Sequence, residues 1–553
     1  METFAILSHR DLFRQEASWD ECHKLLAGVS LESLQKYASN YCHRLTYGDA
    51  LHPGIEAFLR FQHWFLSNYS SNALSGRILE LLKHRRAYRE KSWTLTDPHR
   101  MANLVAAHMV ANPAPPPGEA TYEDMDRLVR AQLMVNDLVS YSRASALERM
   151  GIAEVLRAFS MAQRPDAFSH LPRTFELFAE RLPAAYQELE SRLTARFGVR
   201  FMEVLVFLFT LYHHFLAALD PEVRETGAIP KPHWSRGVVN FSALSANHPG
   251  EAAMERVIGL YSGTWAEIRE ALSTRGVDDV SILPFLRRPF IRLDKAKVWC
   301  FDPALVLMAA TNGLFWLAVR EGGGGTALIR AFGGIFEQYL ADFFKRLAAG
   351  NVRRGDDEGK GLPDFFWMED GVLVAMEAKA NIMEDTVKWA GDELQIRKSM
   401  DAKIIKDNQL MRAVERLFRH DPKLASTVTR VVPVFVVLDM SFASPGLETL
   451  LNTAIEKPNI GLSVEDAHLL WVGEVEATGN FVRQGLFSKL LTARRQVGHG
   501  SVSLGELLNR YQADVRAHVG RSVKPYDAQE SARERLNEKM RKLAEELSVA
   551  IIE

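Results

Sequence analysis

The chain has 553 residues, which is too long for a single hydrophobic core, and at about 150 residues per domain it predicts three or four domains. Its composition, 47% hydrophobic and 25% charged, is that of a globular protein and excludes collagen-like and intrinsically disordered chains. The 67 lysine and arginine residues nearly balance the 69 acidic residues, so any binding of nucleic acid must use a local basic patch.

Cysteine usage and hydropathy favour a cytoplasmic protein. Only Cys22, Cys42 and Cys300 occur, which excludes a disulfide framework and favours a reducing compartment. The first residues carry charges and lack the apolar stretch of a secretory signal. The two most apolar runs, 204–219 and 304–319, are shorter than the roughly 20 residues that span a membrane. We therefore expect a cytoplasmic location and no membrane partner.

The first half of the chain has helical spacing of its apolar residues. A proline-rich loop at 112–118 separates two predicted helical domains, residues 1–118 and 119–281. In both domains apolar residues recur at three- and four-residue steps, which is typical of amphipathic helices. These runs are 32–82, 122–150, 168–197 and 201–219. The fold class of this region is therefore predicted as all-helical.

A connecting segment, residues 282–325, follows the helical domains. Alternating apolar residues predict a strand or hairpin at 290–301, and a helix is expected over 303–319. Four successive glycines at 322–325 carry high backbone entropy and predict a flexible hinge. We expect the main domain boundary there.

After the hinge, helical runs alternate with short β-rich runs, which is typical of a layered α/β domain. We assign residues 326–500 to this domain, with a mixed central sheet flanked by helices, and residues 501–553 to a C-terminal helical extension. The predicted helices are 326–349 and 401–420, and the predicted strands are 364–368, 372–379, 431–438 and 469–475. Pro433 lacks an N–H and is expected near a strand start or on an edge strand. The last helix, 529–552, is charged and amphipathic, so it either docks back or mediates association.

The dipeptide Asp370-Gly371 fixes a hairpin in this domain. Asp-Gly between two apolar runs is typical of a two-residue type I′ turn, which needs positive φ at both positions. In that register, paired residue numbers sum to 741, and Asp364 lies opposite Glu377. Opposite residues have Cβ atoms roughly 5 Å apart, and Lys379 shares the face of Glu377 because strand side chains alternate.

This register predicts a cluster of two carboxylates and one ammonium. The strand 372–378 is apolar on both faces, so it is expected in the centre of the sheet, where two facing carboxylates repel and lose hydration. A hard divalent cation resolves that conflict, because Mg²⁺ prefers oxygen ligands. Such an ion lowers the pKa of bound water and stabilises the charge that develops on a phosphodiester. Lys379 would then orient or deprotonate the water, or stabilise the transition state.

Glu337 is a candidate third carboxylate. It lies seven residues before Phe344 and therefore on nearly the same, apolar side of its predicted helix. An acid on that side could give a metal another oxygen ligand, or it could pair with a helix cap or an arginine.

Pro363-Asp364 followed by Glu377-Ala378-Lys379, in a helix–strand–hairpin–helix order, resembles the PD-(D/E)xK nuclease superfamily. The resemblance covers roughly residues 326–476, under a third of the chain. It implies a restriction-endonuclease-like fold, metal ligation by Asp364 and Glu377, a catalytic Lys379 and an accessory acid at Glu337. Members often have a glutamine on the following helix, for which Gln409 is the candidate. The alternative is that Pro-Asp is only a turn and that Glu-Ala-Lys only ends a solvated strand.

Taken together, these patterns predict a divalent-metal-dependent nuclease that uses Mg²⁺, with Mn²⁺ as a substitute. The expected partner is nucleic acid, and the family resemblance implies DNA, in particular double-stranded DNA; basic residues just after Lys379 are expected to bind it. These residues are Arg397, Lys398, Lys403 and Lys406. The helical region suggests a sensor, a partner protein or a homo-oligomer, as in bacterial restriction or anti-phage defence. The alternative is a non-catalytic nucleic-acid-binding or scaffolding protein on a degenerate nuclease fold.

Overall fold

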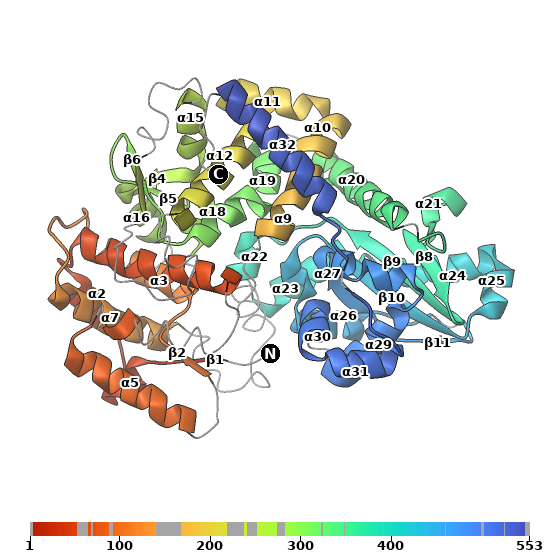
Figure 1. The fold of residues 1–553 in the computed structure, drawn as a ribbon, viewed down its shortest axis with the longest axis horizontal. Coiled ribbons are helices and arrows are strands. Elements are labelled where there is room, and N and C mark those ends of the chain that lie inside the picture. The colour runs from red at the N-terminus through yellow and green to blue at the C-terminus, as the bar shows by residue number, and fades with distance from the viewer. Residues whose placement is uncertain are drawn as a thin grey trace.

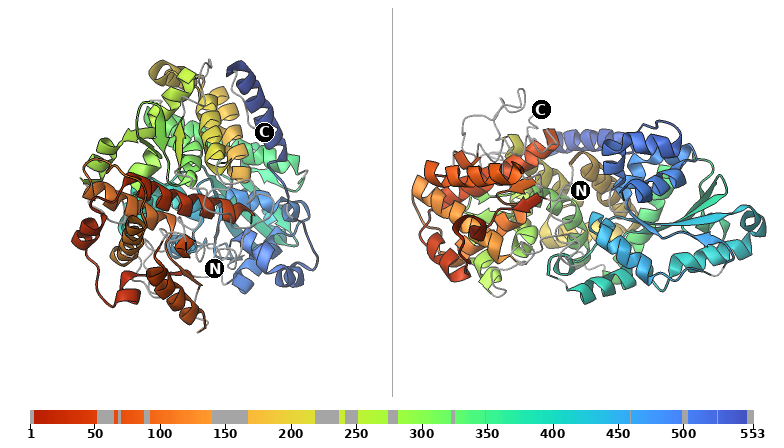
Figure 2. Two further views of the ribbon diagram at one scale, coloured as in Figure 1. Left: turned by 60° about the vertical axis from the view of Figure 1, so that its left-hand side comes forward. Right: turned by 90° about the horizontal axis from the view of Figure 1, so that it is seen from below.

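The computed structural model describes most of the chain in one elongated particle. The described residues are 4–51, 65–67, 70–87, 92–139, 167–217, 237–240, 251–273, 282–321, 325–347, 349–390, 392–458, 460–498, 503–524 and 526–547. Figures 1 and 2 show the first helices gathered at one end of the molecule and a sheet with its covering helices at the other. No described helix is both long and apolar enough to span a membrane.

The described residues up to position 139 are mainly helical. The helices are α1 His9–Phe13, α2 Trp19–Leu26, α3 Leu31–Leu51, α5 Asn72–Ala87, α6 Pro98–Ala111 and α7 Tyr122–Leu138. The prediction of an all-helical region is wrong in one detail, because strands β1 (Phe4–Ile6) and β2 (Ser92–Thr94) pair in parallel. Buried Asn136 of α7 explains their position, since its Nδ2 donates to the carbonyl oxygens of Leu7 and Leu95, just past each strand.

The middle of the chain combines broken helices with a small sheet. Its helices are α9 Ala167–Thr174, η3 Phe175–Arg181, α10 Leu182–Ala185, α11 Gln187–Phe197, α12 Phe201–Ala217, α15 Glu251–Tyr261, α16 Trp265–Ser273, α17 Leu283–Arg287, α18 Pro303–Ala310, α19 Asn312–Trp316 and η4 Leu317–Glu321. The helix predicted over 303–319 is interrupted at Thr311, whose hydroxyl bonds back to the Leu307 carbonyl. A hydroxyl that competes for helix carbonyls in this way commonly bends a helix.

A four-stranded sheet in the order β3-β6-β5-β4 also lies in the middle of the chain. Its strands are β3 Val238–Asn240, β4 Ser262–Thr264, β5 Phe290–Arg292 and β6 Lys297–Trp299. Of the two possibilities predicted at 290–301, a strand or a hairpin, the structure has the hairpin, because β5 pairs with β6 in an antiparallel arrangement. The prediction that residues 119–281 are all helical is wrong for β3 and β4, which are completed as strands by their pairing with that hairpin.

The C-terminal part is built on a mixed six-stranded sheet in the order β11-β10-β9-β8-β7, with β12 also paired to β10. Its strands are β7 Arg353–Arg354, β8 Phe365–Glu369, β9 Val372–Lys379, β10 Arg430–Val437, β11 Ser463–Val464 and β12 His468–Trp471. The pairs β7–β8 and β8–β9 are antiparallel, whereas β10 runs parallel to its neighbours β9, β11 and β12. This agrees with the prediction of a mixed central sheet flanked by helices.

Helices cover both faces of this sheet. They are α20 Gly325–Arg346, α21 Gly355–Glu358, α22 Asp385–Ala390, α23 Glu393–Met400, η5 Asp401–Ile405, α24 Gln409–His420, α25 Pro422–Thr427, η6 Met440–Ala443, α26 Pro445–Ala454, α27 Val472–Ala477, α28 Gly479–Arg483, α29 Phe487–Gly498, α30 Leu504–Arg510, α31 Gln512–Val519 and α32 Glu530–Leu547. Val374 and Met376 of β9 belong to one apolar core with α20, whereas Leu373 and Ala375 belong to another with α23, α24 and α26. All eight residues of β9 are buried, as predicted for a central strand.

The helix predicted over 401–420 is two segments. A π-helical turn, η5, ends at Ile405, and α24 begins at Gln409. Between them Lys406, Asp407 and Asn408 all have positive φ, at 44°, 54° and 62°. Non-glycine residues rarely adopt this left-handed conformation, and three in succession have no recognisable sequence pattern.

Two strand predictions also need correction. The strand predicted over 469–475 ends at Trp471, where α27 begins. Pro433 is the fourth residue of β10, an interior strand, rather than at a start or an edge. A proline is tolerated at this position because the strand that pairs with one edge of β10 changes there. Residues 430–431 pair with β11 and residues 434–437 pair with β12.

The largest apolar core extends across the predicted domain boundary. It joins α9 and α12 to α20, β9 and β10, on both sides of the four glycines. Gly322, Gly323 and Gly324 lie outside the described residues. The five-part domain division stays a prediction. The C-terminal helix α32 docks back on α9 and η3, which was one of its two predicted roles.

Candidate active site

The β8–β9 hairpin has the predicted register. Asp370 and Gly371 have φ values of 47° and 81°, as a type I′ turn requires. Phe365 pairs with Met376 and Glu369 with Val372, so paired numbers sum to 741. Asp364 comes one residue before β8 instead of being its first residue, and the register places it opposite Glu377.

Three of the predicted site residues are connected by side-chain hydrogen bonds, and a fourth, Asp364, accepts one from the backbone between two of them. The Lys379 Nζ donates to Glu377 Oε1 at 2.8 Å and to Gln409 Oε1 at 3.1 Å. The backbone N–H of Ala378 donates to Asp364 Oδ2 at 2.7 Å. The hairpin therefore brings Asp364, Glu377 and Lys379 together, and the first residue of α24 adds Gln409.

Burial makes this a costly arrangement of charges. Glu377 is 2% exposed and Lys379 is 3% exposed. Their ion pair uses only one carboxylate oxygen, and Glu377 Oε2 is buried without a hydrogen-bond partner among the described residues. A buried acceptor without a partner costs about 1–3 kcal/mol, or more when it is charged. The site therefore has one buried carboxylate oxygen that no described residue satisfies.

Two other carboxyl groups are held toward their neutral forms. Burial raises the pKa of Asp364 well above its ordinary value, and the nearby Glu377 and Glu337 carboxylates raise it further. Burial also raises the pKa of Glu337, with added repulsion from Asp356 and Glu377. Desolvation combined with like charges is typical of functional carboxylate clusters.

Glu337 reaches the cluster from α20. Its neighbours Phe336 and Leu340 are buried in the core under the sheet, and Glu337 itself is half-buried. Its electrostatic coupling to Glu377 and Lys379 places it within range of the site. Asp356 of α21 is a further acid near Glu337 that sequence reasoning did not single out. The acidic run 356–358, just before Pro363-Asp364, was the available signal.

The left-handed turn before α24 sets the other side of the site. It reverses the chain after η5, so that α24 starts with Gln409 against Lys379. The side chain of Asn408 anchors the turn by donating to the Glu456 carbonyl at 2.6 Å. Desolvation and the positive charge of Lys379 lower the pKa of Lys406, which is therefore also near the cluster. Backbone strain of this kind often occurs at functional sites.

The four predicted nucleic-acid-binding residues have different surroundings. Arg397 pairs with Glu393 one helical turn away at 2.7 Å, and Lys398 is exposed on the same helix. Lys403 donates to the Ile382 carbonyl at 3.1 Å, and burial lowers its pKa, so it holds the loop after β9. Lys406 lies close enough to the site for the charges of Lys379, Glu377 and Asp364 to contribute to the shift of its pKa.

The carboxylates of the site suit a metal ion that takes only one or two protein ligands. Among the described residues, no three histidine, cysteine, aspartate or glutamate side chains are grouped so that they could hold a metal ion. Mg²⁺ needs fewer, because it keeps several waters and usually binds through one or two carboxylates. Asp364 and Glu377 supply that number, and the unpaired Glu377 Oε2 is an available ligand. Mn²⁺ accepts the same oxygen donors.

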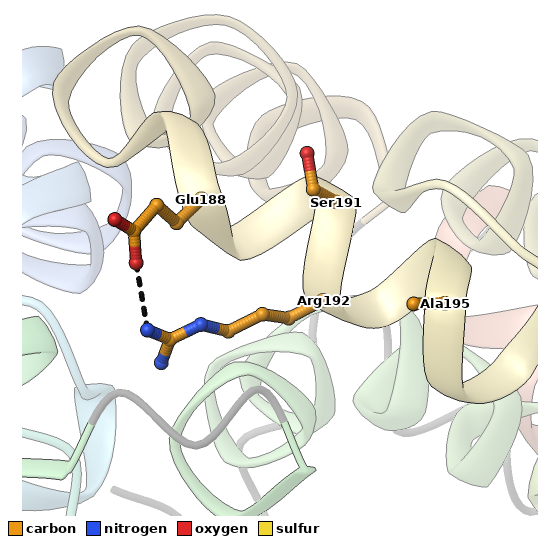
Figure 3. Close-up of a pocket in the computed structure, with 4 residues that line it drawn as sticks. All are labelled: Glu188, Ser191, Arg192 and Ala195. Atoms are coloured by element: carbon orange, nitrogen blue, oxygen red, sulfur yellow. Dashed lines mark hydrogen bonds and ion pairs between the residues drawn. The ribbon is translucent and has the colours of Figure 1, made fainter.

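Other features of the molecule offer less chemistry. Cys22 and Cys42 are buried in the first core, as expected for packing residues. A surface hollow of about 450 Å³ is lined by Glu188, Ser191, Arg192 and Ala195. Figure 3 shows these four residues. All four lie on one face of α11, and Arg192 pairs with Glu188 at 2.7 Å, so the hollow is an ordinary solvated helix surface.

No protein-family model matches the chain, and comparison with curated proteins and with solved structures likewise found no match. Function must therefore be argued from the residues of the site and their geometry.

Proposed function

We propose that this protein is a divalent-metal-dependent nuclease that hydrolyses phosphodiester bonds in DNA. The observation that carries the proposal is the cluster at the start of the β8–β9 hairpin. There Lys379 contacts both Glu377 and Gln409, Asp364 lies opposite Glu377, and one Glu377 oxygen is buried and unpaired. Two carboxylates and a lysine at this spacing suit phosphodiester hydrolysis with Mg²⁺.

Each residue has a proposed role. Asp364 and Glu377 would hold Mg²⁺, with Glu337 as an accessory acid; the ion would neutralise phosphate charge and lower the pKa of a water. Lys379 donates a hydrogen bond to the Glu377 carboxylate, and from that position it can orient the attacking water or stabilise the charge on the phosphate. Gln409 positions that ammonium by accepting one of its hydrogen bonds.

The test is cleavage by the purified full-length protein. Plasmid, linear and single-stranded DNA are incubated with Mg²⁺, with Mn²⁺ or with EDTA. We expect cutting that EDTA abolishes and that Asp364→Ala, Glu377→Ala or Lys379→Ala reduces at least about a hundredfold. Circular dichroism checks that each variant is folded. A glutamine variant of Lys539, which is exposed on α32, serves as a control that leaves the proposed site unchanged. Cutting that survives all three alanine variants would assign the activity elsewhere or to a contaminant.

A non-catalytic binding protein is the second candidate. The observation in its favour is the 2.8 Å pair of Lys379 with Glu377, which by itself neutralises that carboxylate without a metal ion. This reading predicts DNA binding without cutting under every metal condition, unchanged by Lys379→Ala.

The helical region is proposed to regulate the site, as a sensor or partner-binding part of a restriction or anti-phage system. A buried contact between the two parts supports this. Arg173 of α9 makes two hydrogen bonds to Glu476 of α27, at 2.9 and 2.5 Å, and stacks on Trp471 at the end of β12. Trp471 in turn donates to the Leu438 carbonyl, next to the end of β10. Oligomeric state and cytoplasmic location stay predictions.

A further inference from the structure

Helix α24 is strongly amphipathic, and its solvent face is basic. Leu410, Met411, Ala413, Val414 and Leu417 are buried, and most of them join the core beneath β9. On the opposite side, Arg412, Arg416 and Arg419 recur at steps of four and three residues, so they form a single row along the helix. Sequence reasoning missed this row because the notable basic residues before it, 397–406, lie nearer to Lys379 in the chain.

The three arginines are exposed, and their contacts are with nearby residues on the surface. The side chains of Arg412 and Arg419 are 51% and 75% exposed. The Arg412 guanidinium donates to the Asp407 carbonyl and lies 4.0 Å from the Asp407 carboxylate, Arg419 pairs with Glu415 at 3.5 Å, and Arg416 reaches the Gly361 carbonyl at 3.5 Å. Exposed pairs of this kind contribute about 0–1 kcal/mol, so a phosphate can compete for these guanidinium groups.

The local charge balance favours an anionic partner. Between positions 406 and 423 the chain has five lysine or arginine residues and three acidic ones. One of the three acids, Asp421, is paired with Arg353 at 3.3 Å. The whole chain has a formal charge of only −2, so this face is a local excess of positive charge and not part of a basic protein.

The arginine row begins at the candidate active site. Gln409, which accepts a hydrogen bond from Lys379, is exposed and lies on the same side of α24 as the arginines. From Gln409 to Arg419 the helix rises about 15 Å, at 1.5 Å per residue. That length matches about four phosphate steps along one DNA strand, at 3.4 Å each. Figure 1 shows α24 and α25 at the end of the sheet farthest from α2, α5 and α7.

We propose that the solvent face of α24, with Arg412, Arg416 and Arg419, binds the phosphate backbone of double-stranded DNA and leads it to the site at Lys379. This inference rests on the proposed nuclease function and names its substrate-binding surface. Arginine suits the task because its planar guanidinium can bond phosphate oxygens in pairs.

Duplex is favoured over single-stranded nucleic acid by the side chains of this face. Proteins that bind single strands usually stack bases on exposed aromatic rings. Among the described residues, the only large hydrophobic side chains classed as exposed are Tyr122, Ile329 and Leu394, none of which is on α24. A straight row of guanidinium groups without stacking rings suits a rigid backbone better than unstacked bases.

The test measures binding and cutting separately. Fluorescence anisotropy follows a labelled 30-base-pair duplex in EDTA, over a series of salt concentrations, with the full-length protein. The variant combines Arg412→Gln, Arg416→Gln and Arg419→Gln. We expect its affinity to fall at least about tenfold at fixed salt, and its log–log salt slope to decrease by about 2.7, which is 0.9 for each of three phosphate contacts.

Two matched variants sharpen the result. A control replaces three exposed basic residues on α15, α31 and α32 by glutamine, namely Arg256, Arg516 and Lys539. It removes the same net charge and should leave the salt slope unchanged. Replacing the three α24 arginines by lysine should restore most of the slope, because the charges return.

The outcomes distinguish this inference from the nuclease proposal. If the wild type cuts DNA and the α24 variant binds and cuts DNA as well as the wild type, the proposed binding surface is wrong while the nuclease function stands. If the wild type binds through the three arginines but never cuts with Mg²⁺ or Mn²⁺, the nuclease function fails and the surface stands. Tighter binding of single-stranded DNA or RNA overturns the choice of duplex DNA. A wild type that binds none of them overturns both.

Discussion

The substitution Asp364→Asn should stabilise the metal-free protein while it removes a proposed metal ligand. Asp364 is held near two other carboxylates, and burial together with Glu377 and Glu337 raises its pKa. Asparagine keeps an oxygen that can accept the 2.7 Å hydrogen bond from the Ala378 N–H, so the turn into β8 is preserved. The change therefore removes charge without removing that contact.

The magnitude follows from Coulomb's law. Two unit charges about 5 Å apart, the usual spacing of opposite residues on paired strands, repel by about 3 kcal/mol at an effective dielectric constant of about 20. The Lys379 ammonium attracts Asp364 as well, and its loss offsets part of the gain. We expect the free energy of unfolding to rise by about 1–2 kcal/mol. For a folding unit of about 200 residues, each kcal/mol of added stability raises Tm by about 2–4 °C.

The pH dependence gives the sign of the effect. Because the pKa of Asp364 is higher in the folded than in the unfolded protein, the folded state binds more protons between the two values. Wild-type stability therefore decreases as pH rises through that interval, and the advantage of Asp364→Asn should shrink on acidification. Thermal melts of both proteins from pH 5 to pH 8 measure this. Mg²⁺ should narrow the gap at pH 8, because it stabilises only the wild type.

The control is Asp514→Asn, which makes the same change at an exposed carboxylate on α31 and should give no gain. The reasoning fails if Asp364→Asn is no more stable than the wild type at pH 8, or if its advantage grows as the pH falls.

Two further predictions concern stability. Arg173→Ala leaves the buried Glu476 carboxylate without its guanidinium partner and should cost about 3–5 kcal/mol in thermal or denaturant unfolding, whereas Arg192→Ala on the exposed face of α11 should cost under about 1 kcal/mol. Equal effects would show that the Arg173 contact is not a structural tie. Gly371→Ala forces a side chain onto a residue with a φ of 81° and should cost more than about 1 kcal/mol; Gly333→Ala, inside α20 with open space around it, should gain up to about 1 kcal/mol. A neutral Gly371→Ala would contradict the type I′ turn as the source of the register.

The sequence predicted the hairpin and its cluster because the controlling signal is local. Asp370 and Gly371 are adjacent, and their positive φ values fix every pairing between β8 and β9. Alternation then places Lys379 on the face of Glu377, which the hydrogen bond between them confirms. The approach of Gln409 to Lys379 was anticipated only through the family resemblance.

The remainder depends on tertiary contacts that no local pattern reveals. Three successive left-handed residues at 406–408 are uphill for the backbone and are held by contacts such as that of Asn408 with Glu456. The segment after Trp471, with Val472 and Val475 between polar residues, suits a strand or a helix, and its packing decides in favour of α27. The pair of Arg173 with Glu476 joins residues 303 positions apart, a separation that sequence periodicity cannot register.

The apolar core that crosses the four glycines has a consequence for dissecting the molecule. Phe332, Phe336 and Tyr339 of α20 belong to the same buried cluster as Phe175 and Phe178 of η3. A fragment that begins or ends at the glycines would expose these aromatic rings to solvent, and the exposed apolar surface would promote self-association. The roles of the two halves are therefore better tested by point substitutions in the full-length chain than by truncation. Neither half is expected to fold as an independent domain.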